Sequence, residues 1–216
     1  ANARRLLIKH DIPNFVTDDM VIQLGILQNS CAMVLLAFSG ARIGEVVSFG
    51  EDSYKTIKTD EGKEISVLEG DTSKGNDGKP LNTTWQTHPI AKDALELAHD
   101  MTESLREGYR RSIKSLFENG EFDVDECKRA LNEVESVFIP LSESRQESVF
   151  VASGFAGKFN SLMKTFDIRA TEEDVEEFNL LNPSQEGTLE VGGHLPKLSP
   201  HDFRRTFAVF FKRYGF

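Results

Sequence analysis

The segment 199–208, Ser-Pro-His-Asp-Phe-Arg-Arg-Thr-Phe-Ala, constrains the fold most strongly. Its first residues are helix-start signals: Ser199 suits the N-cap, Pro200 suits the first helical position, and Asp202 completes a capping-box pattern. Phenylalanines then recur at helical spacing, at Phe203, Phe207, Phe210 and Phe211. Because such a stripe has to be buried, the segment predicts an amphipathic helix that packs on a hydrophobic core.

A charge pair accompanies this helix. His201 and Arg204 are three residues apart, so they share one helix face and can reach a single anion. The pair also lies near the N-terminal end of the helix, where the helix dipole favours negative charge. A surface histidine beside a salt-bridged arginine would give the same pattern, and the motif alone leaves both interpretations open.

A second segment combines an apolar run with an arginine. The run 31–38 predicts a buried helix that ends at Gly40, and 41–49 predicts a short helix after it. Arg42 would stand at this helix junction, with Glu45 one turn later to hold it. A buried arginine needs a partner, so the position favours a site, although an Arg42–Glu45 surface pair is the simpler alternative.

Together the two segments resemble the tyrosine recombinase (phage integrase) family. The Ala-Arg-Ile-Gly-Glu run at 41–45 is similar to the first box of that family, and 201–208 is similar to its second box, His-x-x-Arg, about 160 residues later. The resemblance implies a mainly α catalytic domain with a small antiparallel β-sheet (α+β). It also implies double-stranded DNA as the partner, assembly of the intact protein into a tetramer on DNA, and no cofactor or metal.

The resemblance also implies roles for individual residues. Arg42 and Arg204 would clamp the scissile phosphate and stabilise charge as the pentavalent transition state forms. His201 would donate a hydrogen bond or move a proton, and Glu45 would orient Arg42. Arg205 is turned about 100° around the helix from Arg204 and receives no role.

A lysine is expected in a β-hairpin turn between the two boxes, as the general acid of the family. The run 70–80 is rich in Gly, Asn and Asp and lies between strand-like segments, which is typical of a hairpin turn. Lys74 is assigned by position and Lys79 is the alternative. A lysine in this turn would protonate the leaving 5′ oxygen.

The family's nucleophile is a tyrosine beyond the second box, and none is assigned in this chain. Tyr54, Tyr109 and Tyr214 are interpreted as structural residues. The sequence is therefore expected to be a catalytic domain truncated before its nucleophile, able to bind DNA weakly and unable to cleave it. Residues 1–16 are expected to form a linker or basic arm and 17–216 the incomplete catalytic domain, with a charged helical insertion around 105–148.

Net charge is the main argument against DNA binding, since the chain carries −10. The charge is uneven, however: 91–150 carries −6, 171–190 carries −7 and the remainder about +3. The acidic stretches are expected to face away from DNA. The histidines show no metal-ligand spacing, and His88 and His194 are interpreted as ordinary strand or loop residues.

Composition and patterning set further expectations. The apolar run 31–38 is too short to span a membrane, and the basic N-terminal stretch does not resemble a signal peptide. Two isolated cysteines are typical of a reducing, intracellular setting. The resemblance to recombinases implies in addition a cytoplasmic, DNA-associated protein of a bacterial or phage-infected cell. Helices are predicted over 17–29, 30–39, 41–49, 91–107 and 172–180. Two further helices are predicted within 109–138, with a break between them at Asn119-Gly120. Strands are predicted over 54–58, 64–68 and 83–90, and the segment 149–166 is expected to return to the core.

Three alternatives to a recombinase remain open. A non-catalytic DNA-binding or regulatory protein could use the same scaffold. An unrelated acidic helical interaction module would explain the net charge, with both boxes arising by chance. Type IB topoisomerases share the chemistry of the family, but the compact spacing of the boxes is more similar to that of integrases.

Overall fold

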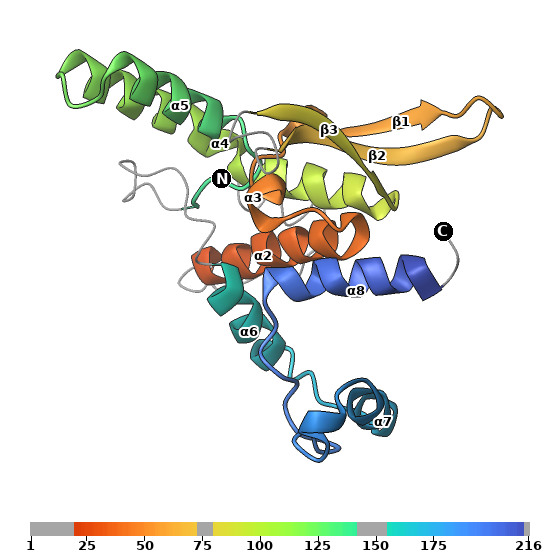
Figure 1. The fold of residues 1–216 in the computed structure, drawn as a ribbon. Helices are drawn as coiled ribbons and strands as arrows, with labels where there is room; N and C mark the ends of the chain where they lie inside the picture. Colours follow the sequence, from red (N-terminus) through yellow and green to blue (C-terminus); the bar gives the residue numbers. More distant parts are fainter. Residues whose placement is uncertain (1–19, 73–79, 142–154, 214–216) are drawn as a thin grey trace.

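The computed structural model describes residues 20–72, 80–141 and 155–213 (Figure 1). This part of the chain is mainly helical with one small antiparallel sheet, so the predicted α+β class is confirmed. The helices are α2 (Met20–Ser39), α3 (Ile43–Val46), α4 (Ile90–Glu118), α5 (Val124–Val134), α6 (Phe155–Thr165), α7 (Glu172–Leu181) and α8 (Pro200–Arg213). The strands are β1 (Tyr54–Lys58), β2 (Glu64–Thr72) and β3 (Leu81–Thr87), and two single 3₁₀ turns are η2 (Glu51–Ser53) and η5 (Pro183–Gln185).

Helix α2 is the centre of the core. It packs against α4, α6 and α8, with α8 running alongside it in Figure 1. The prediction of two helices broken near residue 30 is wrong, because α2 continues through that point. Asn29 and Ser30 donate side-chain hydrogen bonds to carbonyls one turn earlier, which accommodates polar residues inside the helix. The buried residues of α2 that build the core are Cys31, Ala32, Leu35 and Leu36.

The same helix is long and apolar enough, over Ile22–Ser39, to meet the length and composition of a membrane span. The apolar stretch is therefore longer than the run 31–38 recognised in the sequence. Core helices pass the same test, and α2 contacts several other elements of the fold.

Gly40 ends α2 as predicted. Its φ of +63° lies in the left-handed region, and its N–H donates to the carbonyl of Leu36 at 3.2 Å. The following helix is shorter than the predicted 41–49, since α3 is a single turn, Ile43–Val46. Phe49 lies beyond the end of this helix and is fully buried in the core.

The three strands form a meander in the order β1-β2-β3. Thr72 pairs with Leu81 at the end of the β2–β3 ladder, so the predicted hairpin is confirmed, while its turn, 73–79, lies outside the described residues. Strand β2 runs four residues beyond the predicted end. Strand β3 stops before the predicted end because His88 accepts a hydrogen bond from the N–H of Ile90, where α4 begins.

Helix α4 extends well past its predicted end at residue 107. Its second half and α5 enclose a small hydrophobic cluster apart from the main core, made of Tyr109, Ile113, Ala130, Val134 and Ile139. The predicted break at Asn119-Gly120 is confirmed, with Gly120 at φ +75°. The charged region predicted around 105–148 thus begins inside a helix shared with the core, and its residues 142–148 lie outside the described part.

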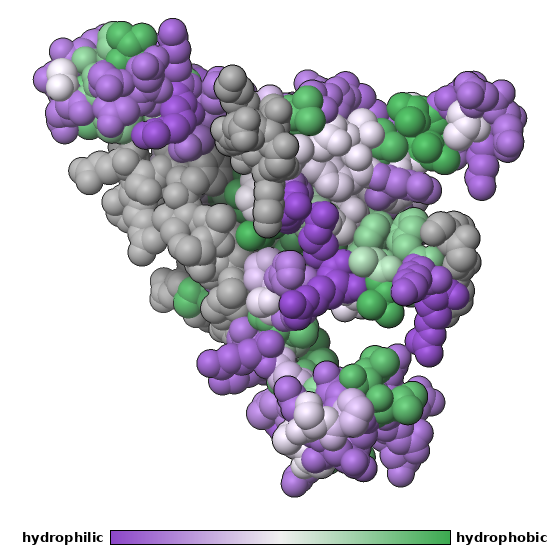
Figure 2. All heavy atoms as spheres, viewed as in Figure 1, coloured by the Kyte–Doolittle hydropathy of each residue, from purple (hydrophilic) through white to green (hydrophobic). Residues whose placement is uncertain are grey.

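Helix α8 packs on the core through part of the predicted aromatic stripe. Phe203 meets Phe159 edge-on with ring centroids 5.7 Å apart, and Phe207 meets Phe211 at 4.4 Å. Phe210 was predicted to join them but is 55% exposed, and it lines an open pocket with Phe207 and Phe211 beside the end of α2. Figure 2 shows hydrophilic side chains towards both ends of α8, whose last turn carries Lys212 and Arg213, and hydrophobic ones between them.

Candidate functional site

The two sequence boxes meet where α8 crosses the end of α2. Nη1 of Arg204 donates a 2.6 Å hydrogen bond to the carbonyl oxygen of Gly40, a residue 164 positions away. Gly40 allows this approach because it lacks a Cβ: a Cβ there would lie 2.5 Å from the ring of Phe207. Arg42 follows Gly40 by two residues, so both arginines are anchored to the same short stretch of backbone.

Arg42 is oriented by Glu45, as predicted. Its Nη1 lies 2.8 Å from Oε1 of Glu45, and its backbone N–H donates to Oε2 at 2.6 Å. Thr72, at the end of β2, donates its hydroxyl to the same Oε1 at 2.7 Å. The Glu45 side chain is 7% exposed and the Arg42 side chain 36% exposed, so the carboxylate is enclosed while the guanidinium remains accessible.

His201 lies on the first turn of α8, one turn before Arg204, and is exposed. The start of this helix is held by Asp202, whose carboxylate accepts hydrogen bonds from the hydroxyl of Ser199 at 2.7 Å and from its N–H at 2.8 Å. These two bonds lower the pKa of Asp202. Half of the predicted capping box is therefore present: the Asp202 carboxylate accepts from the N–H of Ser199, but the Ser199 hydroxyl donates to that carboxylate and the Asp202 N–H donates to the Ser199 carbonyl at 3.0 Å.

The structure does not describe the predicted catalytic lysine, and it places two of the three tyrosines in structural contacts. Lys74 and Lys79 lie outside the described residues, as does Tyr214. Tyr54 and Tyr109 are structural, as predicted: the first bonds to Ser66 at 2.7 Å, and the second is buried and donates to a backbone carbonyl.

The pKa of Glu45 reflects its enclosed position. Burial raises it, but the N–H of Arg42, the hydroxyl of Thr72 and the charged side chain of Arg42 outweigh burial, so the pKa lies below its ordinary value. Glu45 is therefore a carboxylate near neutral pH. A group with a lowered pKa in the folded state adds stability above its unfolded pKa, and this stability is lost as the pH falls through the folded pKa.

We expect Glu45→Gln to lower the free energy of unfolding by about 1–3 kcal/mol near neutral pH, because a buried charge-assisted network is broken. The difference from wild type should hold above the ordinary pKa of a glutamate, about 4.3, and shrink as the pH falls through the lower pKa of Glu45 in the folded protein. Urea unfolding at several pH values measures it, with the exposed Glu96→Gln as the matched control. A difference that stays constant down to low pH would contradict this expectation.

Arg204 is a half-buried cation whose bonding is incomplete. Within the described residues no carboxylate lies within ion-pair distance of it, and its partner is the neutral carbonyl of Gly40. A guanidinium has five N–H donors in a planar fork, so donors remain for an oxyanion. Arg42 also keeps an accessible guanidinium, so each of the two arginines retains N–H donors that could bind an anion such as a phosphate.

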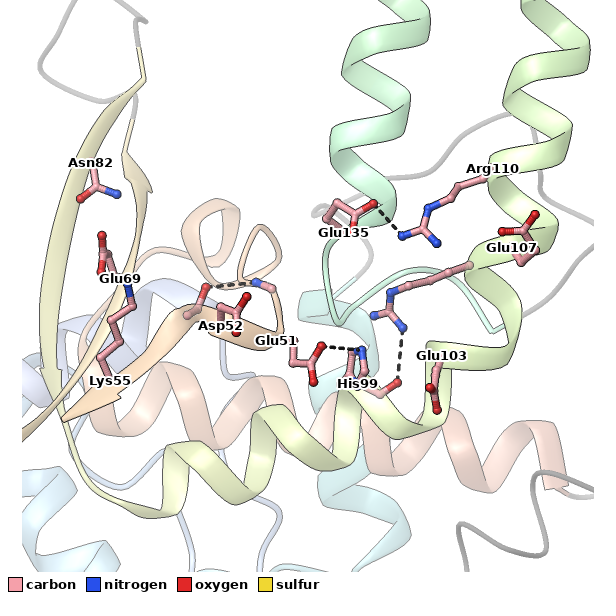
Figure 3. Close-up of a pocket in the computed structure, with 13 residues that line it drawn as sticks. Glu51, Asp52, Lys55, Glu69, Asn82, His99, Glu103, Glu107, Arg110 and Glu135 are labelled. Atoms are coloured by element: carbon pink, nitrogen blue, oxygen red, sulfur yellow. Dashed lines mark hydrogen bonds and ion pairs between the residues drawn. The ribbon is translucent and has the colours of Figure 1, made fainter.

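A separate pocket of about 690 Å³ is lined by none of these residues (Figure 3). It lies between α4, η2 and the sheet, where carboxylates outnumber cations. Its cations are largely paired: Lys55 with Glu69 at 2.7 Å, and Arg110 with Glu135 at 2.8 Å. This pocket would repel a phosphate and is not the site predicted from the sequence.

Metal ligation and thiol chemistry find no support in the part of the chain that the structure describes. Among residues 20–72, 80–141 and 155–213, no group of three or more His, Cys, Asp or Glu side chains could hold a metal ion. Cys31 and Cys127 are free, and burial raises the pKa of Cys31 to about 12, so that thiol stays protonated.

Comparisons of the chain with family models, with curated proteins and with solved structures each find no match. The candidate site is therefore defined by the geometry of its own residues.

Sequence reasoning missed two members of the site. The carbonyl of Gly40 anchors Arg204, although the sequence marked Gly40 only as a helix end. Thr72 was included in the turn, whereas it ends a strand and bonds to Glu45. Neither partner has a local signal, because backbone acceptors and cross-element hydroxyls follow no fixed spacing.

Proposed function

We propose that Arg42, His201 and Arg204 bind a backbone phosphate of double-stranded DNA, and that the intact protein is a site-specific tyrosine recombinase or integrase. The observation that carries this proposal is the 2.6 Å bond from Arg204 to the carbonyl of Gly40, which joins the two arginine segments. Two guanidinium groups can hold the non-bridging oxygens and stabilise the added charge of the transition state.

In this proposal a tyrosine hydroxyl attacks the phosphorus, forming a 3′-phosphotyrosyl bond while the bond to the 5′ oxygen breaks. Lys74 gives its proton to the departing 5′ oxygen, and the reverse reaction rejoins a strand. His201 contributes a hydrogen bond or proton transfer. The proposal assigns no tyrosine of this chain as nucleophile, and it includes a tetramer assembled on DNA.

The acidic helices favour a second candidate, a helical module that binds a protein partner. Helix α7 carries Glu172, Glu173 and Asp174 in its first turn, and α5 carries Asp125 and Glu126 in its first turn. Such a module would have no affinity for DNA at any salt concentration. A non-catalytic DNA-binding protein on the same scaffold would bind DNA and is separated from a recombinase only by a cleavage assay on the intact protein.

The test is DNA binding by Arg204→Ala with Arg205→Ala as the matched control. Both changes remove one positive charge from the same turn of α8, but Arg205 is exposed and has no predicted role. Fluorescence anisotropy with a labelled duplex, at salt concentrations from about 25 to 200 mM, gives the affinity and its salt dependence. We expect Arg204→Ala to weaken binding about five- to tenfold and to reduce the salt slope by about 1.

The Arg205→Ala variant should change affinity by less than about twofold at the same salt concentration. Equal losses for the two variants would mean that binding depends on diffuse charge, which contradicts an anion site at Arg204. Absence of wild-type binding at the lowest salt concentration would favour the interaction module. Thermal unfolding of each variant checks that the fold is retained.

A further inference from the structure

We infer that Thr72 is a positioning residue for the proposed phosphate site: its hydroxyl fixes the Glu45 carboxylate that orients Arg42. This inference rests on the proposed function, because it assigns a role within the same site. The supporting observation is that one carboxylate oxygen, Oε1 of Glu45, accepts from both Thr72 at 2.7 Å and Arg42 at 2.8 Å.

The orientation of a carboxylate depends on its hydrogen-bond partners. The terminal torsion of glutamate is broad, so rotamer preference alone does not hold the plane of the group. In Glu45, Oε2 is held by the backbone N–H of Arg42 and Oε1 by Thr72 and the arginine side chain. Without the hydroxyl, the only remaining donors among these would belong to Arg42, the residue that needs orienting.

Thr72 itself is held by the sheet. It pairs with Leu81 in the β2–β3 ladder, and the same strand is anchored in the core by Val67 and Leu68, both buried. Its β-branched side chain has few accessible χ1 rotamers, so a fixed backbone also fixes the hydroxyl. The sheet therefore sets the position of a donor on Glu45, and Glu45 sets the guanidinium of Arg42.

This arrangement gives the hairpin a second role in the proposed chemistry. Lys74 follows Thr72 by two residues in the sequence, so the strand that leads to the general acid also orients the phosphate-binding arginine. A hydroxyl that only satisfied a buried carboxylate would contribute to stability alone. A positioning role and a purely stabilising role predict different results when substitutions of Thr72 and Arg42 are combined and DNA affinity is measured.

The experiment measures duplex DNA binding by Thr72→Val and Thr72→Ser, each in the wild-type and Arg42→Ala backgrounds. Valine keeps the shape and removes the donor, whereas serine keeps the donor. We expect Thr72→Val to weaken binding about fivefold, Thr72→Ser to stay within about twofold of wild type, and Thr72→Val to add no loss once Arg42 is alanine. Thr56→Val, at an exposed threonine of β1, is the matched control and should bind like wild type.

An NMR titration of the Glu45 carboxyl provides a readout independent of DNA. Its pKa should rise in Thr72→Val and not in Thr72→Ser, which shows that the hydroxyl acts on the carboxylate in the folded protein. An unchanged Glu45 pKa in Thr72→Val would overturn the inference. Thermal unfolding confirms that each variant is folded under the binding conditions.

The binding outcomes separate the inference from the proposed function. Binding that depends on Arg42 and Arg204 but is unchanged by Thr72→Val would overturn the role of Thr72 and leave the phosphate site standing. Losses from Thr72→Val and Arg42→Ala that simply add would also overturn it. Binding that is insensitive to both arginines would overturn the proposed function, and the inference with it.

Discussion

Gly40→Ala is expected to lower the free energy of unfolding by about 2–5 kcal/mol. The left-handed backbone at φ +63° costs an alanine about 1–2 kcal/mol. The new methyl would also lie 2.5 Å from the ring of Phe207, and overpacking of this kind adds about 1–3 kcal/mol. Because the carbonyl of Gly40 anchors Arg204, the same change should also weaken the DNA binding that we propose.

The two contributions can be measured separately. Gly62 has φ +77°, and a Cβ added to it would meet nothing within 4 Å, so Gly62→Ala reports the backbone cost alone. The double variant Gly40→Ala/Phe207→Ala removes the aromatic ring, so it should recover the part of the lost unfolding free energy that comes from the clash with that ring. Urea unfolding of these variants and of wild type gives the values. A Gly40→Ala effect no larger than that of Gly62→Ala would show that Phe207 moves aside at no cost.

Phe49→Ala should have an effect of similar size, about 3–5 kcal/mol, because the side chain is fully buried. Phe49 lies between the first box and the hairpin: its ring meets Trp85 edge-on with centroids 5.5 Å apart, and it approaches the backbone at Gly70. A cavity here would loosen β2 two residues before Thr72. We therefore expect DNA binding to fall as well, in conditions where the variant remains folded.

Phe117→Ala is the matched control for this prediction, since Phe117 is 43% exposed near the end of α4. It should change the free energy of unfolding by less than about 1 kcal/mol. Both variants are compared by urea unfolding, followed by anisotropy with labelled duplex below the unfolding transition. Equal effects of the two substitutions would contradict the burial of Phe49 in the core.

Local signals predicted the parts of the site that depend on neighbours in sequence. A glycine after an apolar run indicated the left-handed end of α2, and the spacing of Arg42 and Glu45 indicated their ion pair. Ser199 and Asp202 marked the start of α8 in the same way. Each of these features is determined by residues at most four positions apart.

The sequence could not predict features that depend on tertiary packing. Asn29 and Ser30 looked like a helix boundary, but their side chains bond to the preceding turn inside a buried helix. The helix predicted over 91–107 continues through Gly108, although a glycine inside a helix costs about 1 kcal/mol. Tyr109 and Ile113 offset that cost by burial against α5, a partner that the helical pattern of α4 does not reveal.

The bond between Arg204 and Gly40 has a consequence for the order in which the chain folds. The Arg42–Glu45 and Thr72–Glu45 bonds close loops of 3 and 27 residues, whereas the Arg204 bond closes a loop of 164. Long-range contacts form late because closing a long loop costs conformational entropy before the contact itself stabilises the chain. During synthesis on a ribosome, Arg42 would be oriented while Arg204 was still untranslated, so a nascent chain would hold the Arg42–Glu45–Thr72 network before α8 docks and brings Arg204 to Gly40.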